Sequence, residues 1–287
     1  MPELKSSDGR PSLWFEMRGD RSGDPVVLLH GFTGTHRTWD ELGERLSEKH
    51  FLILPDLPGH GRSGVSRSRA KMGIGPTSDR VAEVMGLAMG VKGRRKAALL
   101  GYSLGGRVAL ELACRHQERL SCLILEGASP GIQGEVEREE RRARDGSLAD
   151  AIERRGVEWF VDQWQETPLF ATQKELPPQS FDAVRRDRLS NSARGLAMSL
   201  RGAGTGEMLP LWNKIEDLRI PVLLVVGKRD PKYSEAGEAM HRLVPGSVVA
   251  EVDGAGHCVH VEKPEEFADI VERFLADHSE MLRAAEE

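Results

Sequence analysis

The chain has 287 residues, of which 39% are hydrophobic and 30% charged, with a formal net charge of −5 at pH 7. This composition is typical of a soluble globular protein with one large domain or two small ones, and the negative charge argues against a nucleic-acid partner. No run approaches the roughly 18 apolar residues of a membrane span, and the opening MPELKSSDGRPSLW lacks the apolar stretch of a secretory signal. The three cysteines are odd in number and lack metal-type spacing, so we expect a cytoplasmic protein with reduced thiols.

Short apolar runs recur along the chain, each closed by a turn signal: PVVLLHGF, FLILPDLPGHG, KAALLGYS, CLILEGASPG, PVLLVVGKRD and SVVAEVDGAGH. They are nearly continuous in Val, Leu and Ile, which is typical of strands buried on both faces of a parallel sheet. Helix-like stretches separate them: THRTWDELGERLSEKH, TSDRVAEVMGLAMG and SLGGRVALELACRH. The alternation predicts an α/β fold with a mostly parallel central sheet flanked by helices, and SLWFEMRGD fits an antiparallel edge strand.

The alternation stops between about residues 131 and 215, where amphipathic helices are expected: EVEREERRARD, VEWFVDQWQ and FDAVRRDRLSN. The run PVLLVV then resumes the sheet. We therefore expect a core formed by residues 1–130 and 216–287, and a helical cap formed by residues 131–215. An insertion at this point would lie over the carboxyl ends of the strands, where open α/β sheets bind ligands.

The segment GYSLGG places Ser103 between an expected strand and an expected helix. That context is typical of a nucleophile elbow, whose tight turn needs small neighbours such as Gly101 and Gly105. The start of the helix would place the serine hydroxyl near oriented amides and positive dipole. The alternative is an ordinary Gly/Ser turn without chemistry.

Two partners for Ser103 follow along the chain in the order serine, acid and histidine, which is typical of the catalytic triad that accompanies a nucleophile elbow. Asp230 ends PVLLVVGKRD, and His257 ends SVVAEVDGAGH. In such a triad the histidine takes the serine proton, and the acid orients the imidazole and stabilises its charged form. Asp230 could instead be a turn residue before Pro231, and His257 a loop histidine. Glu126, which ends CLILE, remains a second candidate for the acid.

The segment HGF, residues 30–32, closes the first buried strand. An oxyanion hole in this fold takes one backbone amide from the residue after the nucleophile and one from this early loop. The sequence therefore predicts that Leu104 and Phe32 supply those amides. The alternative is a plain turn.

Metal binding is not expected. His60, His257 and His260 are not accompanied by a clustered set of Cys, His or carboxylate ligands. We expect Cys258, beside His257, to be a small packing residue rather than a second nucleophile.

The segments HGF, DLPGHGRS, GYSLGG, GKRD and GAGH together resemble the α/β-hydrolase superfamily, over nearly the whole chain. That fold hosts esterases, C–C hydrolases, epoxide hydrolases and lyases, so it leaves the reaction open. A narrower resemblance extends into the expected cap. The stretches HGFTGTHRTWDEL, GYSLGGRVAL, LILEGASPGI, RRARD, PLF and GLAMSLRGAGTGEMLPLW are similar to the menaquinone-biosynthesis 2-succinyl-6-hydroxy-2,4-cyclohexadiene-1-carboxylate synthase family.

This resemblance implies a lyase that eliminates pyruvate from 2-succinyl-5-enolpyruvyl-6-hydroxy-3-cyclohexene-1-carboxylate, with no metal or organic cofactor. The triad would then make Ser103 a base that removes a proton, and the partner would be a small polycarboxylate. Two other interpretations stay open. The same triad serves a serine hydrolase of small esters or C–C bonds, and the fold also occurs in non-catalytic ligand-binding proteins.

The resemblance also implies substrate-binding residues, namely Tyr102, Arg107, Arg141, Trp164 and Arg188. A substrate with three carboxylates calls for planar, bidentate cations near the elbow, which supports arginine in this role. The register in the cap leaves neighbours open: Arg142 or Arg144 in place of Arg141, and Arg185 or Arg186 in place of Arg188. The glutamate-rich helix around Arg141 could equally be a solvated face. The oligomeric state is left open.

Overall fold

The structure, a computed structural model, describes residues 3–5, 8–90 and 96–284. Eight strands form one sheet in the order β1-β2-β4-β3-β5-β6-β7-β8. They are Glu3–Leu4 (β1), Leu13–Arg18 (β2), Asp24–Leu29 (β3), His50–Pro55 (β4), Ala97–Tyr102 (β5), Leu120–Glu126 (β6), Val222–Gly227 (β7) and Val248–Val252 (β8). The pairs β1–β2 and β2–β4 are antiparallel, and the pairs from β4 to β8 are parallel. The predicted fold class is confirmed, but the expected edge strand is not at the edge, because β1 pairs with β2 outside it.

Helices follow most strands, as the alternating pattern predicted. The α-helices are Asp40–Leu46 (α1), Ile74–Met89 (α2), Leu104–His116 (α3), Glu135–Gln165 (α4), Pro178–Leu189 (α5), Ala193–Ala203 (α6), Trp212–Ile215 (α7), Pro231–Leu243 (α8), Val259–Glu262 (α9) and Pro264–Ala284 (α10). Short 3-10 helices are His36–Trp39 (η1), Arg69–Met72 (η2), Gln117–Arg119 (η4) and Pro168–Glu175 (η5). None of the helices in the described ranges is long and apolar enough to cross a membrane.

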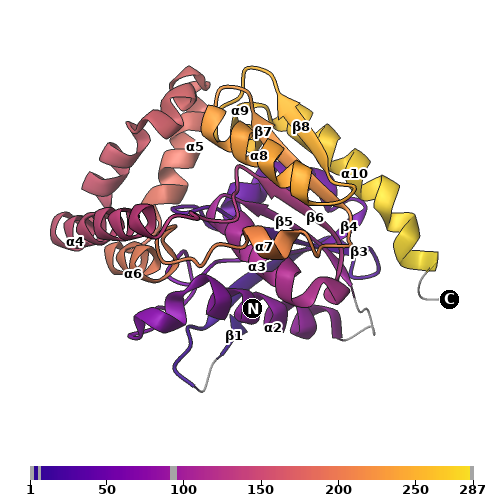
Figure 1. The fold of residues 1–287 in the computed structure, drawn as a ribbon, viewed down its shortest axis with the longest axis horizontal. Coiled ribbons are helices and arrows are strands. Elements are labelled where there is room, and N and C mark those ends of the chain that lie inside the picture. Colours follow the sequence, from indigo (N-terminus) through magenta and orange to yellow (C-terminus); the bar gives the residue numbers. More distant parts are fainter. Residues whose placement is uncertain (1–2, 6–7, 91–95, 285–287) are drawn as a thin grey trace.

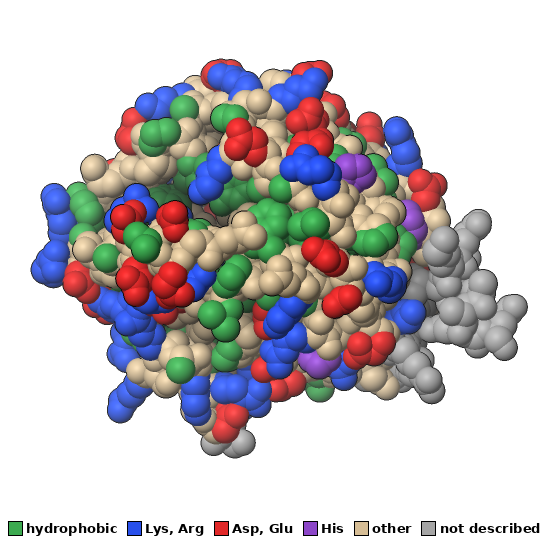
Figure 2. All heavy atoms as spheres, in the orientation of Figure 1, with side chains coloured by type: hydrophobic (Ala, Val, Ile, Leu, Met, Phe, Trp, Pro, Cys, Tyr) green, Lys and Arg blue, Asp and Glu red, His purple; other side chains and the backbone are tan. Residues whose placement is uncertain are grey.

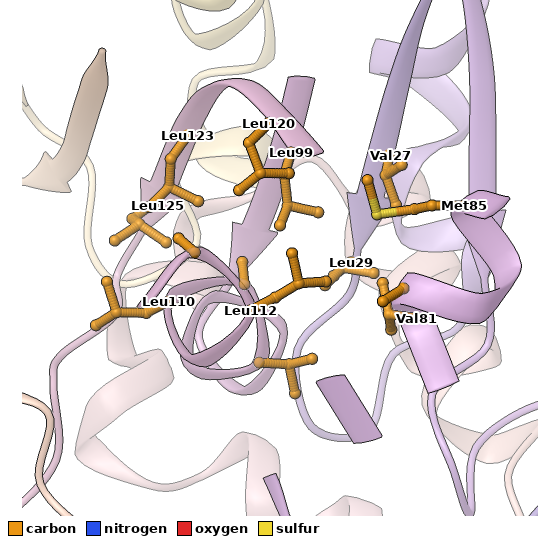
Figure 3. Close-up of a cluster of buried hydrophobic side chains, with 14 of the residues drawn as sticks. Val27, Leu29, Val81, Met85, Leu99, Leu110, Leu112, Leu120, Leu123 and Leu125 are labelled. Atoms are coloured by element: carbon orange, nitrogen blue, oxygen red, sulfur yellow. The ribbon is translucent and has the colours of Figure 1, made fainter. Parts of the chain in front are cut away.

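Two hydrophobic cores cover the two faces of the sheet. Successive residues of a strand point to opposite faces, so Val27 and Leu29 join one core and Val26 and Leu28 the other. The first core, part of which is drawn in Figure 3, packs the strands against α2, α3 and α8. The second packs them against α1 and α10. Burial on both faces explains why the strand segments are nearly continuous in apolar residues.

Helices α4 to α6, with η5 between α4 and α5, stand between β6 and β7 in the chain and form a separate layer to one side of the sheet (Figure 1). The two helices expected at 135–145 and 157–165 both lie within α4, where Gly156 has φ 88° and ψ 170° and breaks the helical path. A left-handed φ suits glycine, which has no Cβ to clash. A third small core joins α4 to α6 through residues that include Ile152, Phe160, Leu196 and Leu200.

Candidate active site

Ser103 occupies the turn between β5 and α3 in a conformation that L-residues rarely adopt, with φ 51° and ψ −104°. Its amide donates to the carbonyl of Glu126, 2.9 Å away on the neighbouring strand β6. The flanking glycines are required by space. A Cβ on Gly101 would lie 2.4 Å from the carbonyl oxygen of Gly105, and one on Gly105 would lie 2.2 Å from that of Leu29. Backbone strain of this kind persists only where the surroundings hold it, and it is concentrated at functional sites.

The structure brings Ser103, His257 and Asp230 together in one hydrogen-bonded chain. His257 Nε2 lies 3.1 Å from Ser103 Oγ, and His257 Nδ1 lies 2.7 Å from Asp230 Oδ2. His257 and Asp230 are 2% and 7% exposed, so water has little access to their hydrogen bond. Because a carboxylate only accepts, Nδ1 donates to Asp230 and leaves the Nε2 lone pair to face the serine hydroxyl.

The loops that carry Asp230 and His257 are tied to each other by their backbones. The amide of Lys228 donates to the carbonyl of Val252, and the amide of Arg229 donates to that of Ala255. A Cβ on Gly227 would lie 2.1 Å from the carbonyl oxygen of Gly256, so the two loops are in close contact there. The relative position of acid and histidine is therefore set by main-chain contacts between adjacent parallel strands.

Glu126, the second candidate for the acid, has a different partner. Its carboxylate, which is fully buried, accepts from the backbone amide of His260 at 3.0 Å and from His260 Nδ1 at 2.8 Å. It is thus committed to His260, and the carboxylate that contacts the His257 imidazole is that of Asp230. The sequence could not separate the two acids, because both end buried strands.

The expected oxyanion residues belong to segments that lie close to Ser103. Leu104 is the first residue of α3, and a Cβ placed on Gly31 would lie 3.5 Å from Ser103 Cβ, so the loop that carries Phe32 passes against the serine. The Phe32 ring packs edge-on against Trp164 of α4, with ring centroids 5.6 Å apart. The loop after β3 is therefore in contact with α4 through the rings of Phe32 and Trp164.

The side chains of Tyr102 and Cys258 are hydrogen-bonded to each other next to the triad. Tyr102 Oη lies 2.6 Å from Cys258 Sγ, and its ring centroid is 5.3 Å from that of His257. Burial raises the pKa of both the phenol and the thiol above their usual values. The thiol therefore stays protonated at neutral pH, which agrees with its expected role as a packing residue.

Arg107 and Arg141 bring positive charge to one side of the triad. Arg107 Nη1 donates to the carbonyl of Ala203 at 2.7 Å, and burial lowers the pKa of Arg107 to about 10, so it remains charged at neutral pH. Arg141 Nε donates to Asp145 at 2.8 Å on its own helix, and its charge acts on Arg107. Of the neighbours left open by the register, Arg142 pairs with Glu207 beyond α6.

Arg188 of α5 is 5% exposed and lies on another side of the site. Its guanidinium donates to Gln173 Oε1 at 2.9 Å and lies 4.7 Å from the centroid of the Phe170 ring. Desolvation lowers its pKa, and no carboxylate of the described residues lies within 4.0 Å of it. Of the alternatives in the register, Arg185 pairs with Asp162, whereas Arg186 is exposed and lines the same cavity as Arg188.

A cavity of about 580 Å³ extends from these residues between α5 and the loop after β3. Its lining includes Arg188, Gln173, Phe170, Tyr102 and Cys258. The triad residues are not part of its lining, although Tyr102 and Cys258 are their immediate neighbours in the chain. In Figure 2 the surface is hollowed between the region of α4 and that of α8, with hydrophobic atoms in the hollow and Lys or Arg atoms at its rim.

Two side chains of the site were missed by the sequence reasoning, and both lie at the start of α8. The Tyr233 ring centroid is 4.5 Å from that of His257. Lys232 Nζ lies 5.3 Å from the centroid of Tyr233, and the charges of Arg141, Arg107 and Arg144 act on it. In the sequence, only their position directly after Asp230 could have indicated them, because the residues that follow the triad acid begin a helix beside the site.

Within the described ranges, no group of three or more His, Cys, Asp or Glu side chains is arranged to hold a metal ion. His60 and His260, which raised that question, have other partners. His60 Nδ1 donates to the carbonyl of Pro58 at 3.1 Å, and His260 donates to Glu126.

Comparison with known proteins decides the family. The protein-family model described as "Alpha/beta hydrolase family" matches residues 26–270 of this chain. The chain belongs to the alpha/beta hydrolase family. It is 39% identical to a Bacillus subtilis (strain 168) protein named "Putative 2-succinyl-6-hydroxy-2,4-cyclohexadiene-1-carboxylate synthase", over 90% of this chain and 92% of the relative.

Two further relatives point the same way. A Salmonella schwarzengrund (strain CVM19633) protein named 2-succinyl-6-hydroxy-2,4-cyclohexadiene-1-carboxylate synthase is 31% identical, over 90% of this chain and 96% of its own length. The solved structure of MenH from S. aureus superimposes with a TM-score of 0.87 at 32% identity, covering 93% of this chain and 98% of the other. The alpha/beta-hydrolase and synthase resemblances found in the sequence are thus confirmed.

Proposed function

We propose that this protein is a lyase that releases pyruvate from 2-succinyl-5-enolpyruvyl-6-hydroxy-3-cyclohexene-1-carboxylate, as the names of its relatives suggest. The observation that carries the proposal is the charge around the triad. Arg188 is buried and Arg107 is half-buried, neither is paired with a carboxylate of the described residues, and both lie next to residues of the triad turn. Uncompensated buried guanidinium groups are costly, and a polycarboxylate substrate would satisfy them.

In the proposed reaction, Ser103 removes a proton from C2 of the ring, the carbon next to the succinyl carbonyl. His257 accepts the serine proton, and Asp230 stabilises the imidazolium that forms. The amides of Phe32 and Leu104 would hold the enolate oxygen, much as an oxyanion hole holds a tetrahedral intermediate.

The enolate then collapses by elimination. A double bond forms between C2 and C3, the C3–C4 double bond moves to C4–C5, and the bond from C5 to the enolpyruvyl oxygen breaks. The leaving group takes up a proton and becomes pyruvate. The electrons balance without a redox partner, and no step in this scheme calls for a metal or an organic cofactor.

The helices of residues 131–215 act in this proposal as a cap that selects the substrate. Arg141, Trp164 and Arg188 come from that segment, whereas Ser103, Asp230 and His257 come from the ends of strands. Tyr102 supports the histidine side of the site through its contact with Cys258. The cytoplasmic location expected from the sequence stays a prediction.

The proposal is tested by supplying the purified protein with precursor made in situ and measuring pyruvate with a coupled assay. The expected result is pyruvate release in step with formation of the diene. An activated aryl ester is the comparison substrate. A burst of alcohol from the ester, with no pyruvate from the precursor, would overturn the proposal in favour of a serine hydrolase.

A further inference from the structure

The loop after β3, which carries Phe32, is held from outside the core by the last turn of α5. Asp187 is the main contact. Its carboxylate accepts from the backbone amide of Thr35 at 3.0 Å, from Thr35 Oγ1 at 2.5 Å and from Thr38 Oγ1 at 3.2 Å. Three donors from one short segment therefore converge on a single carboxylate of α5. A carboxylate that accepts several hydrogen bonds makes stronger contacts than a neutral acceptor.

Asn191, just beyond the end of α5, holds the same loop from a second point. It is 5% exposed, and its Nδ2 donates to the carbonyl of Thr33 at 2.7 Å. Its Oδ1 accepts from the backbone amide of Gly61 at 2.9 Å. One side chain thus joins two core loops to α5 and leaves neither end of its amide group unpartnered.

The loop needs such support because its backbone is strained. Thr33 has φ 75°, and Thr33 and Ser103 are the two non-glycine residues with positive φ in the described ranges. A β-branched residue in this region costs free energy that its surroundings must offset. The turn is closed by the Gly34 amide, which donates to the carbonyl of Gly31 at 3.1 Å. Asn191 and Asp187 then hold the carbonyl of Thr33 and the amide of Thr35.

We propose that Asp187 and Asn191 are positioning residues for the oxyanion hole. By fixing Thr33 and Thr35 they set the direction of the Phe32 amide, so the donor pair of Phe32 and Leu104 is complete only while α5 is docked on the core. This inference rests on the proposed function for the role of the Phe32 amide. It assigns to the cap a second task besides substrate binding.

The test uses Asp187→Asn and Asn191→Ala, with Asp182→Asn as the matched control. Asp182 lies on the same helix and is exposed. A fluorophosphonate probe labels Ser103 at a rate that depends on the triad and the oxyanion hole, whatever the natural substrate is. Because loss of one oxyanion donor costs about 10²- to 10³-fold, we expect labelling to slow at least tenfold in both variants and to stay unchanged in the control.

Two further readouts separate positioning from general destabilisation. Amide hydrogen exchange should rise in residues 31–38 and remain unchanged in β5. With the precursor as substrate, kcat should fall at least tenfold while KM changes less than about threefold, because the loop supports the transition state rather than the ground state. Thr38→Val removes a single hydrogen bond and gives a smaller loss in the same direction, should either larger change prevent folding.

Folded Asp187→Asn and Asn191→Ala proteins that label as fast as Asp182→Asn would overturn the inference, as would an unchanged rate for Thr38→Val if neither folds. Failure of the proposed function gives a different pattern. In that case the wild-type protein releases no pyruvate, while the labelling rates and hydrogen exchange still separate the variants from the control.

Discussion

The strand-end loops and the layer of α4 to α6 contribute to the site in different ways. In the loops, Ser103, His257 and Asp230 form a continuous hydrogen-bonded chain, and main-chain contacts between the segments after β7 and β8 hold its acid and histidine in place. In the helical layer, Arg141 and Arg188 come from separate helices and are held by separate neighbours. The comparison teaches that the hydrogen-bonded triad is assembled at the ends of the strands, whereas two of the arginines proposed to bind the substrate are added by the inserted helices.

The largest effect should come from breaking the strand-end chain. His257→Ala removes the acceptor of the Ser103 proton, and a positioned general base typically contributes about 10²- to 10⁴-fold. We expect kcat for pyruvate release to fall at least about 100-fold, while the circular dichroism spectrum shows that the fold is retained. A loss of less than about tenfold would show that the hydrogen-bonded triad does not carry out the proton transfer.

The next effect should come from Arg188, which tests the selective role of the helical layer. Arg188→Ala removes a buried cation from the cavity, and a charge-assisted hydrogen bond is worth about 1.5–3 kcal/mol. This corresponds to a rise in KM of roughly tenfold or more, with a smaller change in kcat. Steady-state kinetics on Arg185→Ala, a neighbour on the same helix that pairs with Asp162 and is not part of the cavity lining, provides the control. Equal kinetics for the two variants would remove Arg188 from the site.

A smaller effect should separate Arg141 from Arg142. Because Arg141 is tied to Asp145 and partly solvated, we expect Arg141→Ala to lower kcat/KM by several-fold, with little effect on folding. Arg142 pairs with Glu207, so Arg142→Ala should leave kcat/KM unchanged. The opposite ranking would mean that the cap helix presents a different face to the substrate.

The smallest effect concerns Lys232, on the border between the two regions. Lys232 is exposed, but partial desolvation and the nearby arginines lower its pKa below the usual 10.5, so its positive charge is lost at a lower pH than for an ordinary lysine. If the charge helps to hold the substrate, KM should rise as the pH increases through that lowered pKa. Lys232→Met should raise KM a few-fold at neutral pH and remove this dependence. Lys228→Met, which breaks an exposed pair with Asp253, serves as the control and should behave like wild type.

The strand-end half of the site could be predicted because its signals are local. Each strand is an apolar run closed by a turn, and the small residues around Ser103 follow from the space in that turn. The order of serine, acid and histidine then pointed to His257 and to an acid from either Asp230 or Glu126. Choosing between Asp230 and Glu126 needed the structure, because both carboxylates end buried strands and only their spatial neighbours differ.

The cap half could be predicted only in part, because its contacts depend on how helices pack. The separate partners of Arg142 and Arg185 lie on other segments of the chain, so their pairings depend on how those segments pack. The same holds for the contact of Asp187 with Thr35, which joins residues 152 positions apart. No periodicity in the cap sequence encodes these pairings.

The central claim is that Ser103 acts as the base in a pyruvate-releasing elimination. It is tested most directly by comparing pyruvate release from the precursor by wild-type protein and by Ser103→Ala at equal concentration. The account predicts release by the wild type and a loss of at least about 100-fold in the folded variant. A variant that retains more than about a tenth of the wild-type rate would contradict it.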